Sequence, residues 1–130
     1  MKLATIRDAG TTRAVRIDGD GEAAVAVDLG VPTVREVLER DGWRGWAAAA
    51  DGATRPLAGV EYAALIPRPD KTICIGLNYR THILEGGDRP IPEFPPLFAK
   101  YPETLIGAND PILLPPESDA VDWEAELAVV

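Results

Sequence analysis

The chain has 130 residues, a formal net charge of −8 and a hydrophobic content of 46%, values typical of one soluble globular domain or of a small domain with part of another. Its acidic surface repels nucleic-acid phosphates and anionic lipid head groups, so we expect no nucleic acid and no membrane as partners. Cys74 is the single cysteine, which excludes an intramolecular disulfide and a cysteine-rich zinc site and favours a reducing, cytoplasmic location.

The first part of the chain shows the alternating pattern of β-strands. Val15 and Ile17 alternate with small or polar residues, residues 18–21 supply turn-forming aspartates and glycines, and residues 24–29 alternate again. This pattern predicts a β-hairpin, with residues 1–7 as its partner strand.

A short helix is predicted next. Thr33 and Glu36 have capping-box spacing, and the apolar residues that follow have helical spacing up to Gly42, which suits the position after a helix end. We expect Trp43 and Trp46 to pack this helix onto the sheet. A stacking platform for a ligand is the alternative.

The composition changes at the proline-rich joint of residues 66–70. Residues 1–69 carry 9 basic and 10 acidic residues, whereas residues 70–130 carry 4 basic and 11 acidic ones, and ten of the 12 prolines lie from Pro67 onward. We therefore predict a small β-rich N-terminal domain over residues 1–66 and a second domain from residue 67 to residue 130.

Short elements are predicted in the second domain. We expect strands over residues 71–76, 97–100, 111–116 and 123–130, and a helical turn or ordered loop over residues 78–85. Residues 86–96 contain two glycines and four prolines, which are incompatible with regular structure. Because the apolar residues 128–130 end the chain without a polar tail, we expect the sequence to be the N-terminal piece of a longer protein.

His82 is the only histidine and lies three positions before Glu85. On a helical turn this spacing places both side chains on one face, where the carboxylate can hold the imidazole in one tautomer and raise its basicity. Such a pair can deprotonate water. A solvated surface pair is the alternative.

Glu124 and Glu126 lie two positions apart, so on a strand both carboxylates would share one face. Paired carboxylates repel one another unless a cation or a proton lies between them, and hard oxygen ligands favour Mg²⁺, Mn²⁺ or Ca²⁺. Asp119 and Asp122 add to this acidic cluster. An exposed acidic strand face is the alternative.

Lys100 follows the apolar run of residues 97–99 and is the only positive charge after Arg89. It is a candidate for pairing with a substrate carboxylate or with the acidic cluster. Arg80, beside the histidine, is the second candidate for substrate binding. A surface lysine at a strand end is the alternative for Lys100.

Taken in order, these motifs closely resemble the fumarylacetoacetate hydrolase family over about residues 67–130. The residues that carry the resemblance are 73–82 (ICIGLNYRTH), Glu85, 97–100 (LFAK), 106–107 (IG), 115–118 (PPES) and 121–130 (VDWEAELAVV). Residues 1–66 look like the variable small N-terminal domain of many members.

The resemblance implies a rolled, mixed β-sheet around a divalent metal, within a homodimer. The overall fold class is then mainly β with short helices (α+β), cut short at Val130. The resemblance assigns Glu124 and Glu126 as metal ligands and His82 as the catalytic histidine. Glu85 would be the acidic partner of His82 on a mobile, lid-like segment over residues 83–96.

The resemblance also limits the expected chemistry. Family substrates are acylpyruvate-type 1,3-dicarbonyls and 2-oxo acids, which implies carbon–carbon hydrolysis; isomerisation or decarboxylation of 2-oxo or 2-hydroxydienedioate substrates is the alternative. An aspartate ligand of the longer fumarylacetoacetases is replaced here by Ile75, and the family's third ligand lies beyond Val130. An inactive fragment, or a non-catalytic folding or dimerisation domain, therefore also remains open.

Overall fold

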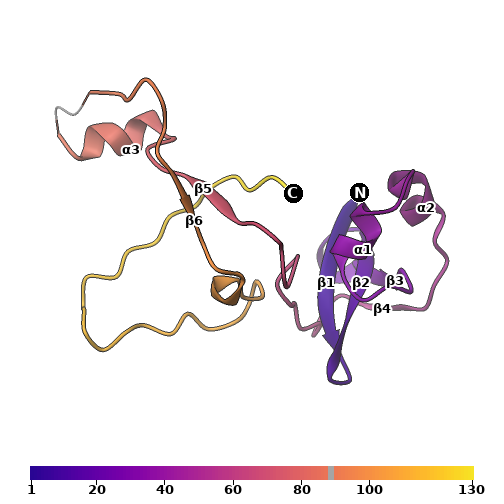
Figure 1. The fold of residues 1–130 in the computed structure, drawn as a ribbon. Helices are drawn as coiled ribbons and strands as arrows, with labels where there is room; N and C mark the ends of the chain where they lie inside the picture. The colour runs from indigo at the N-terminus through magenta and orange to yellow at the C-terminus, as the bar shows by residue number, and fades with distance from the viewer. Residues whose placement is uncertain (88–89) are drawn as a thin grey trace.

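The computed structural model describes residues 1–87 and 90–130 and has a mixed α+β fold with antiparallel sheets, so the predicted fold class is confirmed (Figure 1). The first sheet has the order β1-β2-β3-β4, and a second, two-stranded sheet pairs β5 with β6. None of the helices in the described part of the chain has the length and apolar content that a membrane span requires. The bounds are β1 Lys2–Asp8, β2 Thr11–Asp18, β3 Val25–Asp28, β4 Thr54–Pro56, β5 Ile73–Ile75, β6 Leu97–Ala99, α1 Val34–Leu38, α2 Trp43–Ala49 and α3 Arg80–Glu85.

The predicted hairpin is confirmed as β2 and β3, and β1 pairs with β2 along its whole length. Two features were not predicted. β4 extends the sheet beyond β3, and residues 61–63 run along the outer edge of β1, where Arg7 N donates to Glu61 O at 2.8 Å and Ala63 N to Thr5 O at 2.9 Å. Both edges of the hairpin pair are therefore covered, which removes a site for pairing with another chain.

The first sheet is buried on both faces. Ala14, Leu29 and residues of α1 and α2 form one apolar cluster, and Ile6 and Val15 belong to a second cluster. Neighbouring residues of β2 belong to different clusters because side chains alternate across a strand. Full burial of a side chain such as Ile6, which is 1% exposed, stabilises the fold by about 1.5–3 kcal/mol.

Helix α1 begins as predicted at Thr33, whose hydroxyl accepts from Arg35 N at 3.2 Å and also bonds the Glu36 carboxylate. The buried hydroxyl of Thr5 accepts from Val34 N at 3.0 Å and donates to Leu65 O at 2.6 Å. This hydroxyl therefore joins β1, the start of α1 and Leu65, the residue just before the predicted joint of residues 66–70.

The predicted end of this helix was wrong. Helix α1 ends at Leu38, and Gly42, with φ of 65°, is the N-cap of the unpredicted helix α2, which begins at Trp43. Trp43 and Trp46 lie on α2 and pack against the first apolar cluster, as expected. Arg44 lies over the ring of Trp43 and Arg40 over the ring of Trp46, 4.4 Å and 4.3 Å from the ring centroids.

The second part of the chain docks onto the first sheet through Arg7. Its guanidinium reaches both carboxylate oxygens of Asp110, at 2.8 and 2.5 Å, and donates to Tyr62 O at 2.5 Å. Gly107 lies against the same carbonyl, because an added Cβ would stand 2.0 Å from Tyr62 O. These contacts hold the turn at residues 107–110 against β1 and Tyr62.

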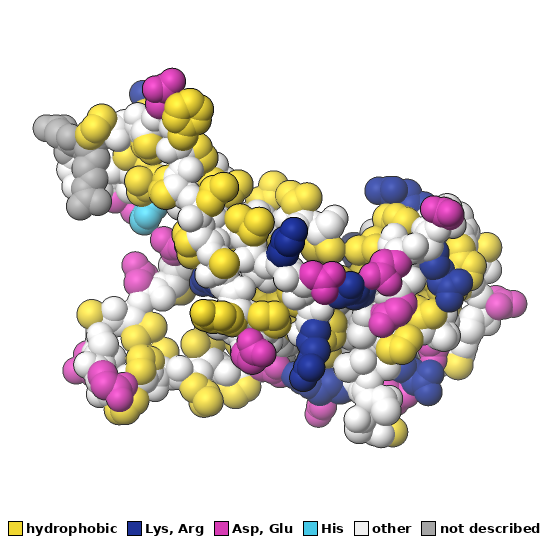
Figure 2. Space-filling model, viewed as in Figure 1, with side chains coloured by type: hydrophobic (Ala, Val, Ile, Leu, Met, Phe, Trp, Pro, Cys, Tyr) yellow, Lys and Arg dark blue, Asp and Glu magenta, His cyan; other side chains and the backbone are white. Residues whose placement is uncertain are grey.

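Two predicted strands were wrong. Residues 111–115 and 123–130 have no regular secondary structure, and residue 116 is in a turn, so none of them belongs to a sheet. A strand needs a hydrogen-bonded neighbour, and the described residues offer none to these segments. Among the described residues after Asp70, Ile83 is the one buried hydrophobic side chain, and apolar side chains cover much of this part of the surface (Figure 2).

Candidate functional site

The site begins where β5 turns into α3. Gly76 donates its N–H to Pro96 O at 2.8 Å, and an added Cβ there would meet the Pro96 ring at 3.1 Å. Leu77 follows with φ of 51°, a left-handed conformation that costs a non-glycine residue about 1–3 kcal/mol. Tyr79 is extended and precedes the first helical residue. This strained turn redirects the chain so that α3 begins at the end of the β5–β6 pair.

His82 and Glu85 lie on the same face of α3, the arrangement that the three-residue spacing indicates. Nδ1 of His82 is 3.5 Å from Oε2 of Glu85. The side chains are 51% and 74% exposed, so water screens their attraction. The expected geometry is therefore present, within reach of solvent and of a small substrate.

A second carboxylate lies on the other side of the imidazole. Nε2 of His82 is 3.6 Å from Oε1 of Glu124, which comes from the C-terminal segment. Both ring nitrogens therefore face a carboxylate. Sequence reasoning placed Glu124 in the metal site and did not foresee this contact.

Tyr79 is the residue that sequence reasoning missed. Its hydroxyl oxygen accepts a hydrogen bond from the backbone N–H of Leu127 at 3.0 Å. Tyr79 precedes His82 by three positions, and this spacing could have suggested that the two side chains share one side of α3.

The acidic side chains do not converge as the strand pattern predicted. Glu124 contacts His82, Asp122 accepts from Trp123 N at 2.8 Å, and Glu126 is exposed. Over residues 1–87 and 90–130, no group of three or more His, Cys, Asp or Glu side chains is arranged to hold a metal ion. The carboxylates are the correct donor type for Mg²⁺, but their arrangement here does not fit a complete metal site.

The structure does not bring Lys100 and Arg80 together: Lys100 lies beside Thr72, at the end of the β5–β6 pair away from α3, whereas Arg80 is on α3. Lys100 follows β6, and its backbone N–H donates to Thr72 O at 3.0 Å, which extends the β5–β6 pairing by one residue. Arg80 is the first residue of α3, and both side chains are exposed. Of the expected lid over residues 83–96, residues 88–89 lie outside the described residues, and the lid's closure stays a prediction.

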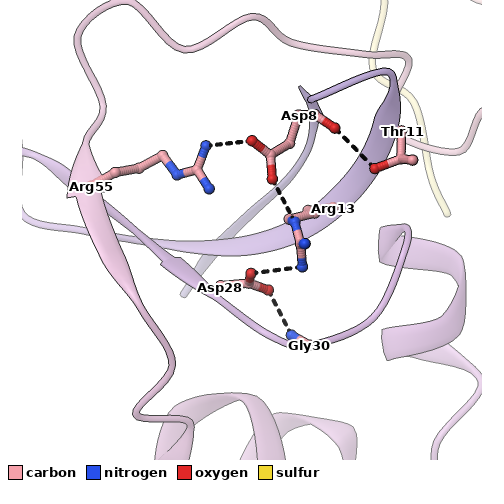
Figure 3. A network of polar contacts seen from close by, with 6 residues as sticks. All are labelled: Asp8, Thr11, Arg13, Asp28, Gly30 and Arg55. Carbon is pink, nitrogen blue, oxygen red and sulfur yellow. Dashed lines mark hydrogen bonds and ion pairs between the residues drawn. The ribbon is translucent and has the colours of Figure 1, made fainter.

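A separate polar network lies on the first sheet, near the turn between β1 and β2 (Figure 3). Asp8 accepts from Arg55 at 3.0 Å and from Arg13 at 2.6 Å, and Arg13 also reaches Asp28 at 3.1 Å. These hydrogen bonds, that from Arg55 first, hold the pKa of Asp8 below its ordinary value. An open cavity of about 860 Å³ beside this network includes none of the predicted site residues in its lining.

Comparison with known proteins shows which family and which relatives these motifs are similar to. The family described as fumarylacetoacetate (FAA) hydrolase C-terminal matches residues 71–130. The oxaloacetate tautomerase Fahd2a of Rattus norvegicus, a mitochondrial protein, is 46% identical over 84 residues, which are 65% of this chain and 26% of that protein. The human oxaloacetate tautomerase FAHD2A is 43% identical over the same shares.

A bacterial relative also matches the N-terminal part. A Burkholderia ambifaria protein described as a hydrolase is 36% identical over 132 aligned residues, which are 100% of this chain and 46% of that protein. The chain therefore spans about a quarter of the length of the tautomerases that it matches, and under half of the Burkholderia protein.

Proposed function

The chain belongs to the fumarylacetoacetate hydrolase family through residues 71–130, and we propose that the protein carrying it interconverts the enol and keto forms of a 2-oxo acid such as oxaloacetate. The observation that carries this proposal is His82, whose two ring nitrogens face Glu85 and Glu124. The names of the relatives supply the substrate class.

Tautomerisation of a 2-oxo acid moves one proton between carbon 3 and the oxygen on carbon 2. In the keto-to-enol direction, neutral His82 takes a proton from carbon 3. The C–H electron pair becomes the C2–C3 double bond, and the oxygen on carbon 2 receives the carbonyl electron pair. The same oxygen then accepts a proton from the imidazolium, so no other reactant is consumed. Glu85 and Glu124 stabilise the imidazolium that exists between the two transfers.

Two cations complete the proposal for substrate binding. A 2-oxo dicarboxylic acid carries two carboxylates that need positive partners, and Arg80 and Lys100 stand on α3 and after β6 respectively. Arg80 offers a planar fork that suits a carboxylate, whereas Lys100 offers a mobile point charge.

A divalent cation, Mg²⁺, Mn²⁺ or Ca²⁺, is a further part of the proposal, supported by the donor type of Glu124 and Glu126. When bound, such an ion would offset the negative charge that develops on the 2-oxo acid. A homodimer and a cytoplasmic location also remain proposals.

A second candidate function is hydrolysis of a carbon–carbon bond in an acylpyruvate. The match to the Burkholderia protein described as a hydrolase covers the whole chain and therefore favours it. In this reaction His82 would take a proton from water instead of from carbon 3.

The two reactions are separated by their products. We expect the protein that carries this sequence to speed the decay of the ultraviolet absorbance of enol-oxaloacetate, and His82→Gln to lower that rate by a factor of about 10² to 10⁴. Thr81→Ser, one position away, is the control and should keep the wild-type rate. Release of pyruvate from an acylpyruvate, without acceleration of the enol decay, would favour the hydrolase instead.

A further inference from the structure

The C-terminal segment is held to the site at two points. The hydroxyl of Tyr79 accepts from Leu127 N at 3.0 Å, and His82 lies 3.6 Å from Glu124. Within the described residues, these are the only hydrogen bond and the only ion pair that join residues 111–130 to the rest of the chain.

The two contacts run in opposite chain directions. Tyr79 precedes His82, whereas its partner Leu127 follows Glu124, the partner of His82. The backbone bond at Leu127 gives the segment a second point of attachment beside α3, which limits how far it can slide. Without that bond, the exposed pair of His82 and Glu124 would have to hold the segment alone, and exposed ion pairs contribute little.

From this geometry we propose that Tyr79 is a positioning residue, whose hydroxyl anchors the backbone at Leu127 and thereby keeps Glu124 facing His82. The inference rests on the proposed function of His82. Tyr79 does not touch the substrate in this role. The left-handed turn at Leu77, two positions earlier, orients the start of α3 and so supports the placement of the Tyr79 ring.

The test is Tyr79→Phe in the protein that carries this sequence, because this change removes the hydroxyl and keeps the ring. Amide hydrogen exchange at Leu127, followed by NMR, should become about threefold to tenfold faster, the change that loss of one ordinary hydrogen bond produces. The turnover of enol-oxaloacetate should fall by a similar factor while KM changes less than about twofold, because Tyr79 holds a group that stabilises the reacting proton rather than the substrate. Tyr101→Phe, which removes the hydroxyl of a tyrosine 77% exposed and remote from α3, is the matched control and should change neither quantity.

The outcomes separate two failures. A wild-type protein that does not accelerate the enol decay overturns the proposed function, whatever the exchange rates. In an active protein, unchanged exchange at Leu127, or unchanged turnover in Tyr79→Phe, overturns the positioning role. A uniform rise in exchange over α3 with equal losses in Tyr101→Phe would indicate general destabilisation and would also overturn it.

Discussion

His82 and Glu124 meet with Nε2 and Oε1 3.6 Å apart, although they come from a helix and from a distant extended segment. The contact gives Glu124 a partner other than a metal ion. Glu126 makes no such contact with His82, so the two glutamates have different surroundings, although their spacing in the sequence predicts the same role for both.

This difference can be measured through cation binding. If both glutamates are metal ligands, Glu124→Gln and Glu126→Gln should each weaken Mg²⁺ affinity by more than about tenfold, since loss even of outer-shell partners of metal ligands costs 10–100-fold. Titration calorimetry with the protein that carries this sequence measures both constants. Glu117→Gln, an exposed glutamate outside the site, serves as control. A loss in Glu126→Gln alone would leave Glu124 as the partner of His82 and remove it from the metal site.

Asp8 makes the stability of the first sheet dependent on pH. Hydrogen bonds from Arg55 and then Arg13 lower its pKa in the folded state, so folding favours the ionised carboxylate. The stabilisation is complete above the ordinary aspartate pKa of 3.8 and is lost as the pH falls through the lower pKa of the folded protein. Asp8→Asn should therefore lower the melting temperature at pH 7 and have progressively less effect below pH 3.8. Thermal melts of both proteins across this pH range give the comparison, with the exposed Asp41→Asn as control; a difference that is constant with pH would contradict the role of the charge.

Two glycines of the first part should respond to alanine in opposite directions. A Cβ on Gly52 would lie 2.1 Å from Asp28 O, a backbone atom that cannot move aside, so Gly52→Ala should destabilise the fold by about 1–3 kcal/mol. Gly45, inside α2, has open space around it, and Gly45→Ala should stabilise the fold by about 0.5–1 kcal/mol. Urea unfolding followed by tryptophan fluorescence would test both. Equal effects of the two substitutions would mean that the contact at Asp28 is not tight.

The sequence by itself determined the elements whose cause is local. Alternation and the glycine-containing turn after Asp18 were enough to predict the β2–β3 hairpin, because register and turn chemistry are properties of neighbouring residues. The capping pair of Thr33 and Glu36 marked the start of α1 in the same way. The motif around His82 also indicated the family whose model matches residues 71–130.

Only the tertiary structure decided which distant segments meet. β4 and the edge formed by residues 61–63 carry little alternation of their own and are ordered by the hydrogen-bonding groups that β3 and β1 offer them. Residues 123–130 have a strand-like sequence but no such neighbour in the described residues, so they form no strand and contact the Tyr79 hydroxyl and His82. A strand forms only when a second segment accepts and donates its backbone hydrogen bonds, and the sequence of one segment does not show whether that partner is present.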